Sequence, residues 1–295
     1  MWTLLLALSA LAAPVTFQVN DALVKDRPVE GVRVRAQAGG EPMDLGSTDP
    51  SGVLVADLAP GTWQIAYGKA GYVPIPASAT VIPPEGSTIT SALSPLLEAT
   101  GDVGHTRVQI VLTWGSEWSD ARDLDAHLVC GPDGTEVYFA ERDHELPSHE
   151  MRLDVDDMDW GGPETITLVD PPPGRHEYFV RNYSGGASTL GTSDVIVRVV
   201  FGDEPVGEFR PLADAESQDW LPFAALVVEA DGRPRIEPFS ADALARGDDR
   251  RTGWGFARAG GCDTACLGGF LCPIGGLVIF MFAASWGRLA RRWFK

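Results

Sequence analysis

Three ionisable residues stand at every second position of the segment DLDAHL. Asp123, Asp125 and His127 alternate there with Leu124, Ala126 and Leu128. Because alternate side chains of a β-strand share a face, this spacing predicts an apolar row toward a core and a polar row opposite it. The polar row, with two carboxylates and an imidazole, is either a binding site or an ordinary solvated strand face.

A second group of carboxylates lies in the segment DVDDMD, directly before WGGPE. The glycines and the proline that follow predict a loop. Calcium takes six to eight oxygen ligands at about 2.3–2.6 Å, and acidic loops supply such ligands. If the loop approaches the DLDAHL strand, we expect a calcium site; otherwise the loop is a solvated acidic surface. The candidate metal ligands are Asp123, Asp125, Asp154, Asp156, Asp157 and Asp159.

Histidine gives the cluster an alternative chemistry. An imidazole at His127 suits zinc better than calcium, or it bonds to a neighbouring carboxylate. The segment HELPSH (144–149) is not the zinc-protease motif, since its histidines are five apart and Pro147 interrupts any helix. No nucleophile elbow, P-loop or dinucleotide fingerprint occurs, so we expect no catalytic residue, no enzyme and no cofactor other than calcium.

The elements that must position these residues are strands. The middle of the chain consists of short alternating runs separated by turn residues, without a convincing amphipathic helix. This pattern predicts an all-β fold of two tandem β-sandwich domains. One C-terminal transmembrane helix is expected in addition, from the apolar segment described below. The sandwiches are expected at 14–97 and 105–232, followed by a linker at 233–263.

The first region carries the motifs GVRV, STDPSG, LAPGTW and KAGY in this order. This order resembles the carboxypeptidase regulatory-like domain, a transthyretin-like sandwich. The resemblance implies a spacer or binding module at the cell surface, related to carbohydrate-binding-like folds. Trp63 and Tyr67 suggest a sugar platform, but their alternation with Ile65 favours core positions instead.

The second region carries LTWG, DLDAHL, GPDGTEVYF, LDVDDMDWGGPETITL, PPPGRHEYFVRNYSGG and DVIVRVV in this order. The set resembles the uncharacterised YfaP-type domain of bacterial surface proteins. Because no activity is established for that family, the resemblance implies a fold and a compartment but no chemistry. The insertion Glu117–Ala121 and the free Cys130 depart from the family pattern.

Both ends of the chain predict export and tethering. Residues 1–13 form an uncharged apolar run that ends in small residues, as in a signal peptide. Residues 264–286 contain no charge and are long enough for a transmembrane helix, and the basic tail 287–295 favours a cytoplasmic C-terminus. The tail also resembles a myxobacterial sorting signal that is cut and lipidated, here at Cys262.

The charge distribution limits the partners. All 41 acidic residues and 19 of the 23 basic residues lie within 14–263, which gives this part a formal charge of −22. Such a charge argues against nucleic acid and anionic lipid surfaces as partners. We therefore expect an exported, membrane-anchored surface protein, outside the cytoplasm, that binds a glycan or protein ligand without catalysis. A structural envelope spacer and an exported hydrolase using the acidic cluster are the alternatives.

Overall fold

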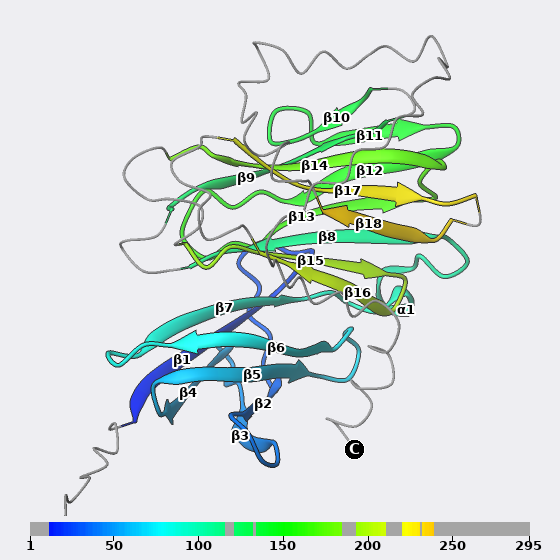
Figure 1. Cartoon of the computed structure of the whole chain (residues 1–295). Coiled ribbons are helices and arrows are strands. Elements are labelled where there is room, and N and C mark those ends of the chain that lie inside the picture. Colours follow the sequence, from blue (N-terminus) through cyan, green and yellow to red (C-terminus); the bar gives the residue numbers. More distant parts are fainter. Residues whose placement is uncertain are drawn as a thin grey trace, which may run out of the picture.

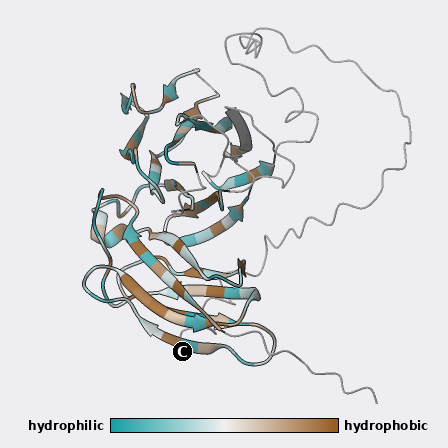
Figure 2. Cartoon of the chain, turned by 90° about the vertical axis from the view of Figure 1, so that its left-hand side faces the viewer, coloured by the Kyte–Doolittle hydropathy of each residue, from teal (hydrophilic) through white to brown (hydrophobic). Residues whose placement is uncertain are grey.

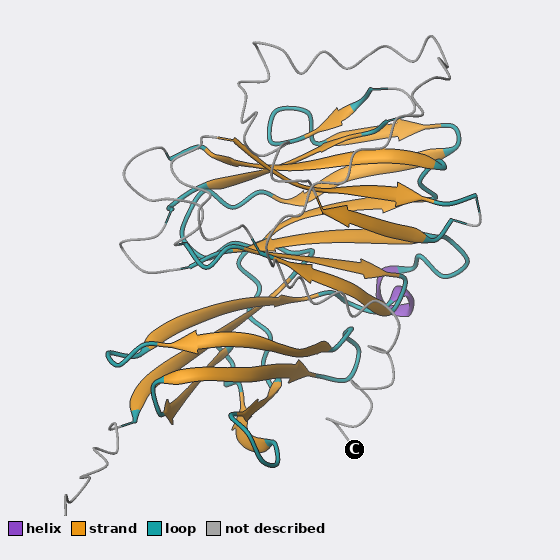
Figure 3. Cartoon of the chain, in the orientation of Figure 1, coloured by secondary structure: helices purple, strands orange, loops and turns teal. Residues whose placement is uncertain are grey.

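The structure, a computed structural model, confirms an all-β fold for the part of the chain that it describes. The residues that it describes are 12–115, 121–131, 134–184, 193–210, 220–230 and 232–238. Among them, one short helix, α1 (Leu97–Thr100), interrupts a succession of strands (Figure 3).

The strands nearest the N-terminus form two sheets around one core, which we call the first module (Figure 1). One sheet has the order β4-β1-β7 and the other β3-β2-β5-β6. The strands are β1 (Ala13–Asp21), β2 (Arg33–Gln37), β3 (Met43–Ser47), β4 (Val53–Leu58), β5 (Gly61–Gly68), β6 (Ile75–Ile82) and β7 (Ser87–Leu93).

Alternation explains these strands. In β1, Val15, Phe17 and Val19 are fully buried in the core, while the residues between them are partly exposed. Tyr67 is buried and Trp63 packs against the same core, so both occupy the core positions that their spacing predicts.

The remaining strands form the second module, again two sheets around a core. One sheet has the order β10-β9-β14-β17-β18 and the other β11-β12-β13-β8-β15-β16. The strands are β8 (Arg107–Thr113), β9 (Leu124–Val129), β10 (Glu136–Val137), β11 (Asp143–Leu146), β12 (His149–Val155), β13 (Glu164–Val169), β14 (Gly174–Asn182), β15 (Ile196–Phe201), β16 (Glu204–Phe209), β17 (Trp220–Val228) and β18 (Pro234–Pro238).

Hydrophobic and hydrophilic residues alternate along many of the strands (Figure 2). In β9, Leu124, Ala126 and Leu128 are fully buried in the core of the second module, as their spacing predicts. The opposite row differs from a solvated strand face, because Asp125 and His127 are only 4% and 2% exposed. The polar row of β9 is therefore covered.

Two boundaries differ from the sequence-based prediction. Residues 234–238, expected in a linker, form β18, because Ile236 packs against the core while its neighbours pair with β17. Ala13, expected at the end of a signal peptide, begins β1 opposite Leu58.

Other predictions fall on residues outside the described ones. These are the signal peptide up to residue 11, the linker beyond 238, the transmembrane helix at 264–286 and the tail at 287–295. Within the described ranges, no helix is long and apolar enough to cross a membrane.

The two modules are in direct contact. The Arg107 side chain, fully buried at the start of β8, binds the segment that joins the two modules: it donates hydrogen bonds to Thr100 Oγ1 (2.6 Å) and to the backbone oxygen of Pro95 (2.7 Å). Ala22 and Ala92 of the first module pack against Val111 of the second.

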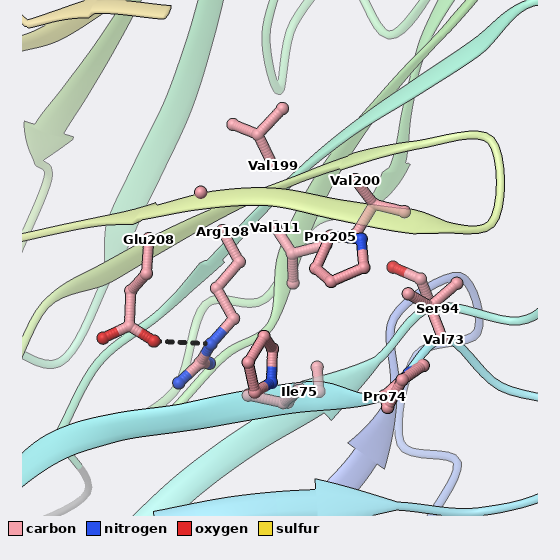
Figure 4. A pocket seen from close by; sticks show the side chains of 13 residues that line it. Val73, Pro74, Ile75, Ser94, Val111, Arg198, Val199, Val200, Pro205 and Glu208 are labelled. Carbon is pink, nitrogen blue, oxygen red and sulfur yellow. Dashed lines mark hydrogen bonds and ion pairs between the residues drawn. The ribbon is translucent and has the colours of Figure 1, made fainter. Parts of the chain in front are cut away.

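Beside this contact lies an apolar hollow with residues of both modules around it (Figure 4). An ion pair between Arg198 and Glu208, with a nitrogen–oxygen distance of 3.0 Å, forms one part of its wall.

Candidate cation site

The DLDAHL segment is the strand β9, and its position in the sheet shapes the site. Along residues 124–129 one side of β9 pairs with β14, which places Asp125 opposite Arg181. On the other side β10 pairs only with Leu128 and Val129. Among the described strands, the edge of β9 at residues 124–126 therefore has no strand partner.

Glu164 occupies this open edge. It is the first residue of β13, in the other sheet, and lies opposite Leu112. Its Oε2 accepts a hydrogen bond of 2.5 Å from the backbone N–H of Ala126. The carboxylate thus replaces a neighbouring strand at this point and joins the two sheets.

The loop before Glu164 fits closely into the module. Gly162 has a φ of 72°, and a Cβ there would lie 2.7 Å from the Trp114 ring. Only glycine satisfies both conditions. The WGGP turn thereby fixes where β13, and with it Glu164, begins.

Three carboxylates converge at the edge of β9. Ligand oxygens of Asp123, Asp125 and Glu164 all lie within 4.8 Å of one another. Asp125 and Glu164 are 4% and 1% exposed, whereas Asp123 is partly exposed. One oxygen of each carboxylate, namely Asp123 Oδ1, Asp125 Oδ2 and Glu164 Oε1, is buried without a hydrogen-bond partner.

The cluster is electrostatically unfavourable by itself. Burial, reinforced by the neighbouring charge of Asp123, raises the pKa of Asp125 to about 7. Burial likewise raises the pKa of Glu164 well above its usual value, although the Ala126 N–H opposes this rise. Burial and the charge of Asp156 raise the pKa of Asp123. Arg122 and Arg181 offset the rises in the pKa values of Asp123 and Asp125 only in part, so the cluster is short of the positive charge that would stabilise its ionised form.

The other four predicted ligands already have basic partners. The shortest nitrogen–oxygen distances are 2.6 Å for Arg152–Asp154, 3.5 Å for Arg142–Asp156, 3.6 Å for Lys25–Asp157 and 3.0 Å for Arg122–Asp159. The structure thus brings together only two of the six predicted ligands. Asp156 still acts on them from a distance, because its charge raises the pKa values of Asp123, Asp125 and Glu164.

His127 belongs to a different contact. Its Nδ1 lies 2.8 Å from Glu136 Oε1, and its ring stacks on Tyr138 with centroids 5.1 Å apart. His127 is not among the residues whose ligand atoms converge at the site. Of the two roles considered for His127, the bond to a neighbouring carboxylate is the one that the structure shows.

Glu164 was missed by the sequence-based prediction, although the sequence contains a signal for it. Glu164 is in phase with Ile166 and Leu168, both fully buried in the core. A carboxylate at a core-facing position of an apolar strand must find a partner or a cation, because burying it alone is costly.

This arrangement matches the chemistry of a hard cation. Three carboxylates offer up to six oxygens, and oxygen-only ligand sets suit calcium, magnesium or manganese more than zinc. A divalent cation would supply the missing positive charge and a partner for each of the unpaired oxygens. Calcium accepts irregular sets of six to eight oxygens, whereas magnesium demands an octahedron.

Comparison with known proteins identifies no family. No protein-family model matches the chain, and neither does any curated protein. Among solved structures, a protein of unknown function, SAV2460, is 19% identical over 46% of this chain and 88% of its own, with a TM-score of 0.33. A homologue of the telluride resistance protein TerD from Streptomyces coelicolor A3(2) is 20% identical over 49% of this chain and 96% of its own, with a TM-score of 0.31.

A third structure, fervidolysin from Fervidobacterium pennivorans, is described as a keratinolytic enzyme related to subtilisin. It is 13% identical over 78% of this chain and 33% of its own, with a TM-score of 0.23. At these TM-scores none of the three similarities carries a conclusion about the function of this chain.

Proposed function

We propose that this chain is an exported, membrane-tethered bacterial surface protein that binds a ligand or partner without catalysis, with calcium supporting the binding module. The proposal combines the apolar segments at the two ends with the carboxylate cluster of the second module. Its tandem modules are two β-sandwiches, the first carboxypeptidase regulatory-like and the second YfaP-type, and a single C-terminal helix anchors them.

The observation that carries the calcium assignment is the set of buried carboxylate oxygens without partners. Buried polar atoms in native proteins nearly always have a partner, and buried charges are paired or bind metal ions. Here Asp123, Asp125 and Glu164 each present one such oxygen to the same small region. A calcium ion resolves all three at once.

The depth of the cluster favours binding over hydrolysis. A glycoside hydrolase needs its acid and its base or nucleophile on either side of a substrate bond. Glu164 and Asp125 are 1% and 4% exposed, too deeply buried for a polymer substrate to reach. Their arrangement suits an ion that supports the fold.

We assign the contact with the glycan or protein to the less buried side of the cluster, where Asp123 lies. Asp123 is partly exposed, and its backbone oxygen accepts a hydrogen bond of 3.1 Å from the N–H of Tyr183. The Tyr183 side chain is 53% exposed, and the Arg181 guanidinium lies 4.9 Å from its ring centroid. A partly exposed ring on a residue whose backbone bonds to that of Asp123 is a surface that either a glycan or a protein can use.

The test is a thermal melt of the full chain in millimolar calcium and in chelator, followed by a glycan array under both conditions. Calcium should raise the melting temperature, and Asp123→Ala should abolish the rise. Binding to the array that needs calcium supports a glycan ligand. An array without hits directs the search to a protein ligand or to the structural-spacer alternative. An unchanged melting temperature refutes the calcium assignment.

A further inference from the structure

The acidic loop beside the cation site is held from the other module. Lys25 lies in the turn after β1, in the first module. Its ammonium donates a hydrogen bond of 2.8 Å to the backbone oxygen of Asp156 and lies 3.6 Å from Asp157 Oδ1. A residue of the first module thus fixes the backbone at the start of the loop that leads to Glu164.

A second contact holds the same loop further along. Gly161 lies against Thr90 of β7, so closely that a Cβ on Gly161 would be 2.9 Å from Thr90 Oγ1. Thr90 is itself buried. The two contacts, at Asp156 and Gly161, clamp the loop at two points onto the first module.

The clamped loop ends at a cation ligand. Eight residues after Asp156 the chain reaches Glu164, whose carboxylate must stay at the edge of β9. Asp156 itself lies close enough for its charge to act on all three carboxylates. A shift of the loop would therefore change both the position of one ligand and the charge around the others.

We propose that the first module is a functional part of the cation site. Lys25 is a positioning residue that contacts the Asp156 backbone oxygen and the Asp157 carboxylate. Through these contacts, calcium binding in the second module is coupled to the packing of the two modules. This inference rests on the proposed calcium site. It assigns the first module a role beyond that of a spacer.

The direction in which removal of Lys25 changes the calcium affinity distinguishes a positioning role from a purely electrostatic one. If Lys25 acted only through its charge, its removal would make the region more negative and calcium would bind more tightly. If Lys25 positions the loop, its removal frees the loop and calcium binds more weakly. The two explanations predict changes in opposite directions.

The experiment measures the calcium Kd of the full chain by isothermal titration calorimetry, with calcium chloride as the only ligand. Lys25→Met is expected to raise the Kd about 10-fold, the lower end of the range for a lost partner behind a metal ligand, because Lys25 holds the loop and does not touch a ligand directly. Lys25→Arg, which keeps the charge and the donors, should restore most of the affinity. Lys69→Met removes the same charge elsewhere in the first module and should leave the Kd unchanged.

A second measurement needs no substitution. Coupling free energies are reciprocal, so calcium must strengthen the Lys25 contact by the same factor by which that contact strengthens calcium binding. Hydrogen exchange on the unaltered chain should therefore show that calcium protects amides around Lys25 as well as those of β9.

The outcomes are distinct. A Lys25→Met Kd equal to or lower than that of the unaltered chain overturns the coupling and leaves the calcium site standing. Hydrogen exchange in which calcium protects the β9 amides but not those around Lys25 also overturns the coupling and leaves the calcium site standing. Unaltered protein that binds no calcium overturns both the coupling and the proposed function.

Discussion

Replacing Asp125 with asparagine should change stability in opposite directions with and without calcium. The asparagine side chain would keep the shape of the aspartate but remove one buried negative charge. Without calcium this charge is destabilising, because Asp125 is 4% exposed and has another carboxylate as its neighbour. With calcium the same charge holds the ion. Asp125→Asn should therefore stabilise the calcium-free protein and destabilise the calcium-loaded protein.

The magnitude follows from the pKa of Asp125, which burial and Asp123 raise from 3.8 to about 7. A raised carboxyl pKa means that the folded state binds the proton more tightly than the unfolded state. The stability that the protonated Asp125 carboxyl gives the folded state is therefore lost as the pH rises from 3.8 through about 7. At about pH 8 the ionised group costs the folded state about 4 kcal/mol. A buried amide without partners costs about 1–3 kcal/mol, so the net gain expected from asparagine is about 1–3 kcal/mol.

The assay is urea unfolding at about pH 8, which gives the free energy of unfolding of both proteins in chelator and in calcium. At a free calcium concentration of about 1,000 times Kd, the unaltered protein should gain about 4.1 kcal/mol. Asp125→Asn should lose most of this gain and so become the less stable protein by about 1–3 kcal/mol. The matched control is Asp159→Asn, which removes the same charge from a carboxylate that is exposed and paired with Arg122. Its effect should stay within about 1 kcal/mol in both conditions.

Two results would refute this reasoning. If Asp125→Asn destabilises the calcium-free protein as well, the carboxylate has a stabilising partner and the cluster is not short of positive charge. If the control Asp159→Asn shows the same reversal of sign, the effect reports the overall charge of the loop and not a site at Asp125.

Three further predictions concern the ion and the junction between the modules. Calcium must displace the proton of Asp125, so calorimetry should show proton release on binding and an affinity that falls about tenfold per pH unit below about 7; a flat profile contradicts the pKa assigned to Asp125. His127→Gln should leave the calcium Kd unchanged, because the imidazole bonds to Glu136, and a large loss would place His127 among the ligands. Arg107→Ala should lower the free energy of unfolding by about 3 kcal/mol with or without calcium, because it removes a buried charge with several hydrogen bonds; an effect below about 1 kcal/mol would mean that the junction does not depend on Arg107.

The strands were predictable where side chains alternate. The spacing of Leu124, Ala126 and Leu128 gives the core-facing side of β9 directly, and the same holds for Val15, Phe17 and Val19 in β1. Such alternation is a local property, since it depends only on which residues follow each other along one strand.

The composition of the site was predictable only in part. Asp123 and Asp125 follow from their spacing, whereas Glu164 reaches them from the opposite sheet, and that approach depends on how the two sheets pack. In the sequence, nothing distinguishes the loop carboxylates, such as those of Asp156 and Asp157, from the carboxylates that converge at the site. They differ because Arg142 and Lys25 approach them in the folded chain, and Lys25 comes from the other module.

The most direct measurement of the central claim is a crystal structure of the protein grown in calcium. We predict one ion bound by oxygens of Asp123, Asp125 and Glu164 at about 2.3–2.6 Å, with the remaining ligands from backbone oxygens or water. A cluster without an ion in saturating calcium, or an ion bound instead by the loop carboxylates Asp154 and Asp157, would contradict it.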